Sequence, residues 1–351
     1  MRGSFKKIKS LILVSITGLL SLGGCMPLSI TDTSLASAKN QMRVGVVLYN
    51  AADPFVMNIA DSITRYAEEE QELSQGKIII DVLDSKNDQQ LQNTQIDELI
   101  KQKYDAIAIN IVDRAESANV IDKVKEAKIP VVFFNREPVP QDMNKWDQVY
   151  YIGAHAAEAG EMQGQILLDA ITGGMKIDRN GDGIIQYVML EGEPGHQDSI
   201  LRSYHSIKVL EDAAIKTENL AMDTAMWQRG EAKDKILEWI EQFENHIEVI
   251  LSNNDEMALG AIEALEARGY FKDNKSIPVI GVDGLTQALQ AIKDDKMLGT
   301  VLNNADAQGK AIFGKLYNLS TGAQSQIVLD YENDGKYLWI PHKIITKEAI
   351  N

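Results

Sequence analysis

Short apolar runs alternate with segments of helical spacing along most of the chain. Each run is four to six residues long, which is typical of buried strands. The runs cover residues 44–49, 78–82, 106–110, 130–134, 150–153, 186–191, 247–252, 278–282 and 299–302. Between the first three of them, residues 55–67 and 91–100 carry apolar side chains at helical spacing. Strands separated by helices predict parallel sheets with right-handed crossovers.

A connector rich in proline and polar residues, 136–146, divides these elements into two groups. The chain has 351 residues, which is more than one hydrophobic core usually serves, since single cores stop growing at roughly 250–300 residues. The sequence therefore predicts an α/β protein with two lobes, each built on a doubly wound parallel sheet.

The first 24 residues combine a basic start with a short apolar run, 11–22. The basic residues are Arg2, Lys6, Lys7 and Lys9. The run is too short to cross a bilayer as a helix, so we interpret residues 1–24 as a signal peptide. Cys25, the only cysteine of the chain, follows Gly23 and Gly24, where a bacterial lipoprotein carries its lipid; a chance buried cysteine is the alternative. We expect residues 25–41 to be a flexible tether that anchors the chain outside the cytoplasm, on the cell membrane.

The chain is acidic. Its formal charge of −16 falls to −20 when the four basic residues of the signal peptide are removed. Such a charge argues against nucleic acid as a partner, because the phosphates would repel it. A single cysteine also excludes a framework of disulfides within the chain.

Polar side chains follow most of the predicted strands, at the end where an open parallel sheet binds its ligands. They are Asp53, Asn110, His196, Asp198, Arg202, Asn254, Asp255, Asp283 and Asn303. Each one by itself is equally explained as a helix cap or a turn residue. Arranged around a cleft, with Phe55 and Trp227 as flat apolar walls, they predict a site for a hydroxyl-rich ligand with apolar C–H faces.

Residues 178–186 have the oxygens and the glycine of a calcium-binding loop. The ligands would be the side chains of Asp178, Asn180, Asp182 and Gln186 and the carbonyl of Ile184. Position 12 of the loop is Met189 instead of Glu, and the residues after the loop are typical of a strand. A further carboxylate must therefore come from elsewhere in the chain. A solvated turn without metal is the alternative.

Eight motifs spread along the chain carry a family resemblance. They are NDQQLQNTQID (87–97), AINIVD (108–113), PVVFFNREP (130–138), GEPGHQD (192–198), DTAMW (223–227), NNDEMALGAIEAL (253–265), GVDGL (281–285) and GTVLN (299–303). With these motifs the chain resembles the periplasmic D-galactose/D-glucose-binding proteins of ABC transport systems from Arg43 to its end. The resemblance implies a type I periplasmic-binding-protein fold with two lobes joined by a hinge. The first lobe would comprise residues 42–130 and 303–338, and the second 131–302 and 339–351.

The resemblance also implies that the cleft closes on one pyranose, D-glucose or D-galactose. Phe55 and Trp227 would sandwich the sugar ring. The polar contacts would come from Asp53, Asn110, His196, Asp198, Arg202, Asn254, Asp283 and Asn303. The sequence does not choose between the two epimers, because one Asp can accept the fourth hydroxyl of either.

The same resemblance implies one structural calcium ion, Ca2+, in the loop 178–186, with Glu248 as the remote carboxylate. Three departures from the family pattern stand out. The lipoprotein box replaces the soluble periplasmic signal of Gram-negative relatives, which favours surface anchoring over a chemotaxis role. Glu191 and Gln197 differ in type from the commonest residues of their motifs, and residues 321–337 match only weakly.

These expectations describe a monomeric transport lipoprotein without catalytic residues, which delivers sugar to the membrane subunits of an ABC permease. The alternative is an extracytoplasmic sensor that presents a different monosaccharide to a signalling receptor. A glycosidase would use similar carboxylates, but the sequence has no nucleophile elbow, His-rich metal site or P-loop. A sugar-responsive repressor would need a helix-turn-helix and a basic surface.

Overall fold

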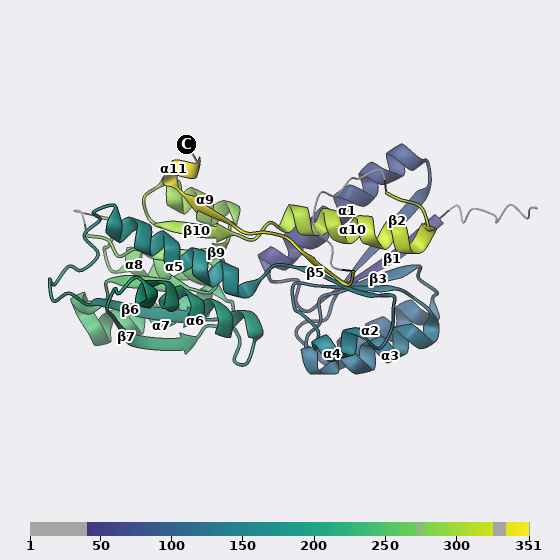
Figure 1. Ribbon diagram of the computed structural model, residues 1–351, viewed down its shortest axis with the longest axis horizontal. Coiled ribbons are helices and arrows are strands. Elements are labelled where there is room, and N and C mark those ends of the chain that lie inside the picture. The colour runs from purple at the N-terminus through teal and green to yellow at the C-terminus, as the bar shows by residue number, and fades with distance from the viewer. Residues whose placement is uncertain (1–40, 273–274, 326–334, 351) are drawn as a thin grey trace, which may run out of the picture. The chain divides into compact units, whose positions relative to one another are not determined.

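The computed structural model describes residues 41–272, 275–325 and 335–350, which belong to one compact unit, Asn40–Asn351 (Figure 1). The predicted signal peptide (1–24), Cys25 and all of the tether except Gln41 lie outside the described residues. Every helix within the described ranges is too short or too polar to cross a lipid bilayer.

Six parallel strands form the first sheet, in the order β11-β5-β4-β3-β1-β2. They are β1 (Gln41–Leu48), β2 (Lys77–Asp84), β3 (Ala106–Ile109), β4 (Val131–Phe134), β5 (Val149–Gly153) and β11 (Tyr337–Trp339). Helices cover both faces of this sheet (Figure 1): α1 (Pro54–Ser74) and α10 (Ala305–Thr321) on one, and α2 (Gln89–Lys101), η1 (Arg114–Glu116), α3 (Ser117–Ala127) and α4 (Pro140–Met143) on the other. The central strands β3 and β4 are consequently buried at every residue.

The second sheet also has six strands, in the order β12-β10-β9-β8-β6-β7. They are β6 (Ile185–Glu191), β7 (Thr217–Thr224), β8 (Val249–Ser252), β9 (Val279–Asp283), β10 (Gly299–Leu302) and the antiparallel edge strand β12 (Lys343–Thr346). Helices α5 (Ala156–Thr172) and α6 (Gln197–Asp212) cover one face, and α7 (Arg229–Phe243) and α8 (Asp255–Ala267) cover the other. The short elements η2 (Glu244–His246), α9 (Thr286–Lys293) and α11 (Lys347–Ile350) complete this part. The predicted α/β class with two doubly wound sheets is confirmed.

The expected boundary between the lobes at residue 130 is wrong. β4 pairs with β3 through Val131 and Ile107, and β5 pairs with β4 through Val149 and Val131. Both strands therefore belong to the first sheet, and the chain leaves this sheet only after Gly153. The polar connector 136–146 misled the assignment, because it holds the small helix α4 and does not separate the lobes.

Three strands lack a counterpart in the sequence pattern. β7 lies at the edge of its sheet, and all of its side chains are exposed or half-buried, so its residues form no apolar run. β11 and β12 are only three and four residues long. Short edge strands of this kind carry little periodicity, which is why the pattern predicted the centre of each sheet better than its edges.

Two glycines bring α5 and α6 into close contact. A Cβ atom on Gly160 would lie 2.7 Å from the carbonyl oxygen of Arg202, and one on Gly164 would lie 2.4 Å from that of Ser206. Both partners are backbone atoms, which cannot move aside without shifting the helix. The absence of a side chain at these two positions therefore sets how close α6 lies to α5.

We predict that Gly164→Ala lowers the free energy of unfolding by about 1–3 kcal/mol, because overpacking against backbone atoms forces the two helices apart. Urea unfolding measures this change. The matched control is Gly230→Ala in α7, where an added Cβ meets no atom within 4 Å. The control should be neutral or stabilising by up to about 1 kcal/mol, and equal effects of both substitutions would contradict the packing argument.

Candidate functional site

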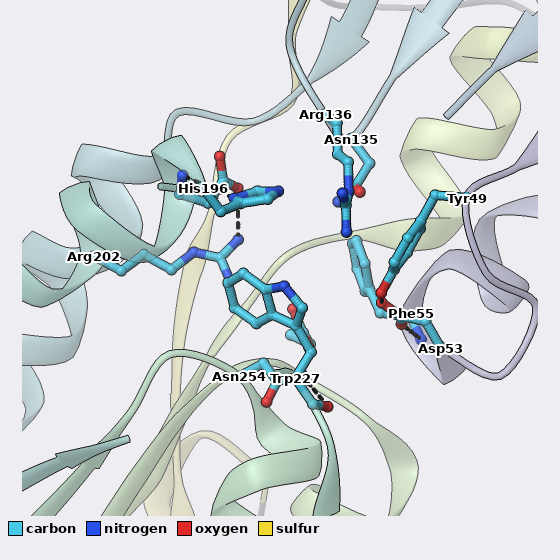
Figure 2. Close-up of a pocket in the computed structure, with 11 residues that line it drawn as sticks. Tyr49, Asp53, Phe55, Asn135, Arg136, His196, Arg202, Trp227 and Asn254 are labelled. Atoms are coloured by element: carbon cyan, nitrogen blue, oxygen red, sulfur yellow. Dashed lines mark hydrogen bonds and ion pairs between the residues drawn. The ribbon is translucent and has the colours of Figure 1, made fainter. Parts of the chain in front are cut away.

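A cavity lies at the carboxyl ends of strands from both sheets. It is lined by Tyr49, Asp53, Phe55, Asn135, Arg136, His196, Asp198, Arg202, Trp227, Asn254 and Asp283 (Figure 2). Eight of the ten predicted sugar-site residues are in this lining, and Asn110 and Asn303 are not. The carboxyl ends of the strands thus gather polar groups from both sheets, as the strand-end rule for open parallel sheets leads one to expect.

Two aromatic side chains give the cavity its apolar surfaces. Phe55 comes from the first turn of α1, and Trp227 from the turn between β7 and α7 (Figure 2). The indole of Trp227 lies against Gly192, where a Cβ would come within 2.0 Å of Cζ2. His196 meets the indole edge-on, with 5.2 Å between ring centroids, and Asn254 Nδ2 donates to the Trp227 carbonyl at 3.4 Å. These contacts hold the ring in place from three sides.

Asp53 caps α1 and also faces the cavity. Its Oδ1 accepts the backbone N–H groups of Phe55 at 2.9 Å and Val56 at 3.2 Å, as an N-cap carboxylate does. Its Oδ2 accepts the hydroxyl of Tyr49 at 2.7 Å. Burial raises the pKa of Asp53, and burial together with the neighbouring Asp53 raises the pKa of Tyr49. The cavity therefore contains a carboxylate that is short of water and gains from further hydrogen-bond donors.

The first turns of α6 supply an imidazole, a carboxylate and a guanidinium. His196 Nδ1 accepts the backbone N–H of Asp198 at 3.1 Å, which leaves its proton on Nε2. Burial lowers the pKa of His196 to about 4, so the ring is neutral at neutral pH. One turn further on, Arg202 forms an ion pair with Asp198 at 3.1 Å and donates to the carbonyl of Asn253 at 2.8 Å. Both contacts fix the guanidinium at the cavity wall.

Two aspartates lie close together at the end of β9. Asp283 is the last residue of this strand; it is only 5% exposed, and burial raises its pKa well above the usual value. Asp255, fully buried behind it, accepts the backbone N–H groups of Gly284 at 2.7 Å and Leu285 at 2.8 Å and the hydroxyl of Thr300 at 2.7 Å. Asp255 thus holds the turn that follows Asp283 and fixes the position of that side chain.

The two predicted residues outside the lining support it from behind. Asn110 is fully buried, and its Nδ2 donates to Asn135 Oδ1 at 3.0 Å and to the Phe134 carbonyl at 3.2 Å. Asn303 Oδ1 accepts the amide of Gln308 at 2.6 Å. Both follow their strands as the sequence suggested, but neighbouring protein groups already use their side chains.

The sequence reasoning missed Tyr49, Asn135 and Arg136. The guanidinium of Arg136 lies over the ring of Tyr49, 3.7 Å from its centroid, and forms an ion pair with Glu193 at 2.9 Å. Asn135 and Arg136 directly follow β4, so the strand-end rule would have found them had this strand been placed in the first sheet. Tyr49 follows β1 in the same way.

The free space between the lining side chains is small, about 30 Å3. A cavity of this size holds about two water molecules. A sugar ring enters only when side chains or the two sheets move apart. The aromatic rings and the Arg136 guanidinium fill the volume that a ligand needs.

The comparisons with known proteins agree with this geometry. A family model described as the periplasmic binding protein domain matches residues 44–324. The chain belongs to this family. The type I fold implied by the sequence resemblance is confirmed as well, because solved structures of solute-binding proteins superpose on this binding protein along most of its length.

Three relatives illustrate the match. The D-galactose/methyl-galactoside binding periplasmic protein MglB of Haemophilus influenzae is 38% identical over 90% of this chain and 92% of its own. The ribose import binding protein RbsB of Bacillus subtilis is 28% identical over 87% of this chain and 90% of its own. A crystal structure of an ABC transporter solute binding protein from Bacillus halodurans, with bound myo-inositol, is 27% identical, has a TM-score of 0.71 and covers 88% of this chain and 96% of its own.

The predicted metal ligands of the loop 178–186 contact one another. Asn180 Nδ2 lies 3.1 Å from both Asp182 Oδ2 and Gln186 Oε1. Glu248 is only 1% exposed and accepts the backbone N–H groups of Asn180 and Gln186, each at 3.3 Å. The pKa of Asp182 is lowered, first by the backbone N–H of Ile184 and then by the amides of Gln186 and Asn180. The loop thus already stabilises negative charge.

These side chains offer only oxygen donors, which suits a hard cation such as calcium. Within the described part of the chain, however, no three His, Cys, Asp or Glu side chains lie close enough together to hold a metal ion. A cation in this loop would therefore depend on the amide oxygens of Asn180 and Gln186 and the carbonyl of Ile184 as well as on carboxylates. The loop precedes β6, whereas His196 follows this strand, so the two sites lie at opposite ends of β6.

We predict that His196 makes the binding protein less stable as the pH falls from about 6.5 to about 4. In this window the unfolded chain binds a proton on the imidazole and the folded protein does not, so acid favours unfolding. A pKa difference of this size corresponds to at most ~3 kcal/mol, and to less here because the ring is only partly buried. Urea unfolding of the parent and of His196→Gln at several pH values isolates the effect, since the variant should lose part of the slope. Parallel curves would show that the imidazole titrates alike in both states.

Proposed function

We propose that this periplasmic binding protein captures D-glucose or D-galactose and delivers it to the membrane subunits of an ABC permease. The observation that carries the proposal is the composition of the cavity. Two aromatic rings, Phe55 and Trp227, lie among the carboxylates of Asp53, Asp198 and Asp283 at the strand ends of both sheets. This combination suits a pyranose, whose C–H faces are apolar and whose edge carries hydroxyls.

The polar groups of the cavity match the needs of a neutral sugar. Carboxylates accept hydroxyl protons, and the guanidinium of Arg202 and the amide of Asn254 donate to hydroxyl oxygens. Asp53 and Asp283 are buried groups with raised pKa values, so hydrogen bonds from ligand hydroxyls would stabilise their charged forms. An anionic sugar, in contrast, would meet these carboxylates with like charge.

The relatives support the same class of ligand. The relative with 38% identity carries D-galactose and methyl-galactoside in its name, and others are named for ribose or were crystallised with myo-inositol. All of these ligands are small polyhydroxylated rings. The higher identity to the galactose-binding relative favours a hexose over a pentose.

Binding needs no chemical step, and we assign no catalytic residues. The chain passes between the two sheets three times, between β5 and α5, between β10 and α10, and between β11 and β12. Such connections allow hinge closure, of which periplasmic binding proteins are the standard example. A sugar that contacts both sheets would favour the closed state by its higher affinity for it. We further propose that the protein acts as a monomer held on the outer side of the cell membrane by a lipid on Cys25.

The test of this function is calorimetric titration of the mature protein with hexoses and pentoses. D-glucose or D-galactose should bind, whereas ribose should not, because Asp198 and Arg202 would contact hydroxyls of a six-membered ring. Tight binding of ribose or arabinose with both hexoses silent would contradict the proposed substrate.

Trp227→Ala serves as the site variant in the same titration. It should weaken hexose binding by about 1–3 kcal/mol, since an aromatic face against the ring is lost. The matched control is Trp239→Ala, because Trp239 is buried in α7 and does not line the cavity. The control should lower stability and leave hexose affinity unchanged in the protein that stays folded.

We also propose that the loop 178–186 binds one structural calcium ion. Its ligands would be the side chains of Asp178, Asn180, Asp182, Gln186 and Glu248 and the carbonyl of Ile184. The buried carboxylate of Glu248 supports this proposal, because it already joins the loop to the start of β8. The ion would stabilise the folded state by binding it in preference to the unfolded chain.

We predict that a chelator lowers the melting temperature and leaves hexose affinity at low temperature unchanged. At a calcium concentration 100 times the dissociation constant the stabilisation is about 2.7 kcal/mol. Glu248→Ala should abolish most of the calcium dependence, whereas Glu238→Ala, which changes an exposed carboxylate of α7, should preserve it. A melting temperature that is indifferent to both chelator and added calcium would refute the metal site.

A further inference from the structure

One ion pair separates the sugar cavity from a larger space outside it. Arg136 follows β4 of the first sheet, and Glu193 follows β6 of the second; their side chains meet at 2.9 Å. The outer space has a volume of about 160 Å3, several times the 30 Å3 of the inner cavity. Arg136, His196 and Asp198 line both spaces, whereas Glu193 lines only the outer one.

The guanidinium of Arg136 is held in one orientation by four contacts. It lies over the ring of Tyr49, donates to the carbonyl of Val112 at 2.9 Å and pairs with Glu193. Its backbone N–H also donates to the Phe134 carbonyl at 2.7 Å, in a turn that starts at the end of β4. The side chain is only 6% exposed, so that it forms a fixed wall between the two spaces.

The lining of the outer space is suited to hydroxyl groups. It includes the guanidinium of Arg114, the carboxylate of Glu137 and the amide of Gln197. A hydrogen bond of 2.9 Å from Gln197 to Glu137 joins the two sheets there, without any contact to Arg136. The outer space has no aromatic side chain in its lining, in contrast to the inner cavity. It would therefore hold a second sugar ring more weakly than the inner cavity holds the first.

We propose that the Arg136–Glu193 pair is a size gate, which restricts the site to a single monosaccharide and closes off a latent subsite for a second sugar residue. The proposal rests on the proposed function. A disaccharide whose first ring occupies the inner cavity would have to separate the pair, and both charges would then be buried without a partner. A single hexose leaves the pair intact.

The test compares monosaccharides and disaccharides by calorimetric titration of the mature protein. The probes are D-galactose, D-glucose, lactose, melibiose, cellobiose and maltose, which include both anomeric linkages. The parent should bind a hexose at least a hundredfold more tightly than any of the disaccharides. In Glu193→Ala this ratio should fall at least tenfold for one linkage, because the gate can open. Glu193→Gln should lower the ratio less, since an amide oxygen still accepts from Arg136.

Glu137→Ala is the matched control. It removes the other contact between the sheets in the outer space and leaves Arg136 and Glu193 paired, so the ratio should not change. If Glu193→Ala and Glu193→Gln weaken all sugars alike, the pair only stabilises the closed protein, and the gate is refuted. A parent that binds a disaccharide as tightly as a hexose also refutes the gate while leaving the proposed function standing. A parent that binds no hexose overturns the proposed function and the gate with it.

Discussion

The backbone N–H groups at the start of helices α1, α6 and α8 need acceptors, because the first turn of a helix provides none of its own. Asp53, His196 and Asn254 supply these acceptors, and the same three side chains line the cavity. One set of hydrogen bonds therefore begins the helices and orients the polar groups between the sheets. A cap and a ligand contact are often treated as competing explanations of such residues. Here the capping bond is what fixes the side chain for the second role.

Two local rules explain why much of the site could be predicted from the sequence. Apolar periodicity located the central strands, and the position just after a strand located most of the polar lining. Strand pairing, in contrast, is not local. Residues 131–134 are apolar on both faces and would suit either sheet, so β4 was assigned to the wrong lobe and Arg136 was overlooked. Asn110 and Asn303 obey the strand-end rule, yet the direction of their side chains depends on neighbours that sequence spacing does not reveal.

The cavity concentrates polar groups in a space with little water. Two arginines are paired with carboxylates there, at 2.9 Å for Arg136 and 3.1 Å for Arg202. The Nε atom of Arg202 is buried and has no hydrogen-bond partner among the described residues. Asp53 and Asp283 are short of donors for the same reason, namely burial. Such groups gain more from a well-placed hydroxyl than exposed groups do, which favours ligands that satisfy several of them at once.

The packing of Trp227 against Gly192 gives the protein an intrinsic optical reporter. The chain has four tryptophans, and Trp227 alone among them lines the cavity. Its indole lies at the boundary between the cavity water and the second sheet, next to an imidazole. Replacing that water by the C–H face of a ring would change the polarity around the indole, and hence its emission. The fold thus contains the optical part of a biosensor, to which no external dye needs to be attached.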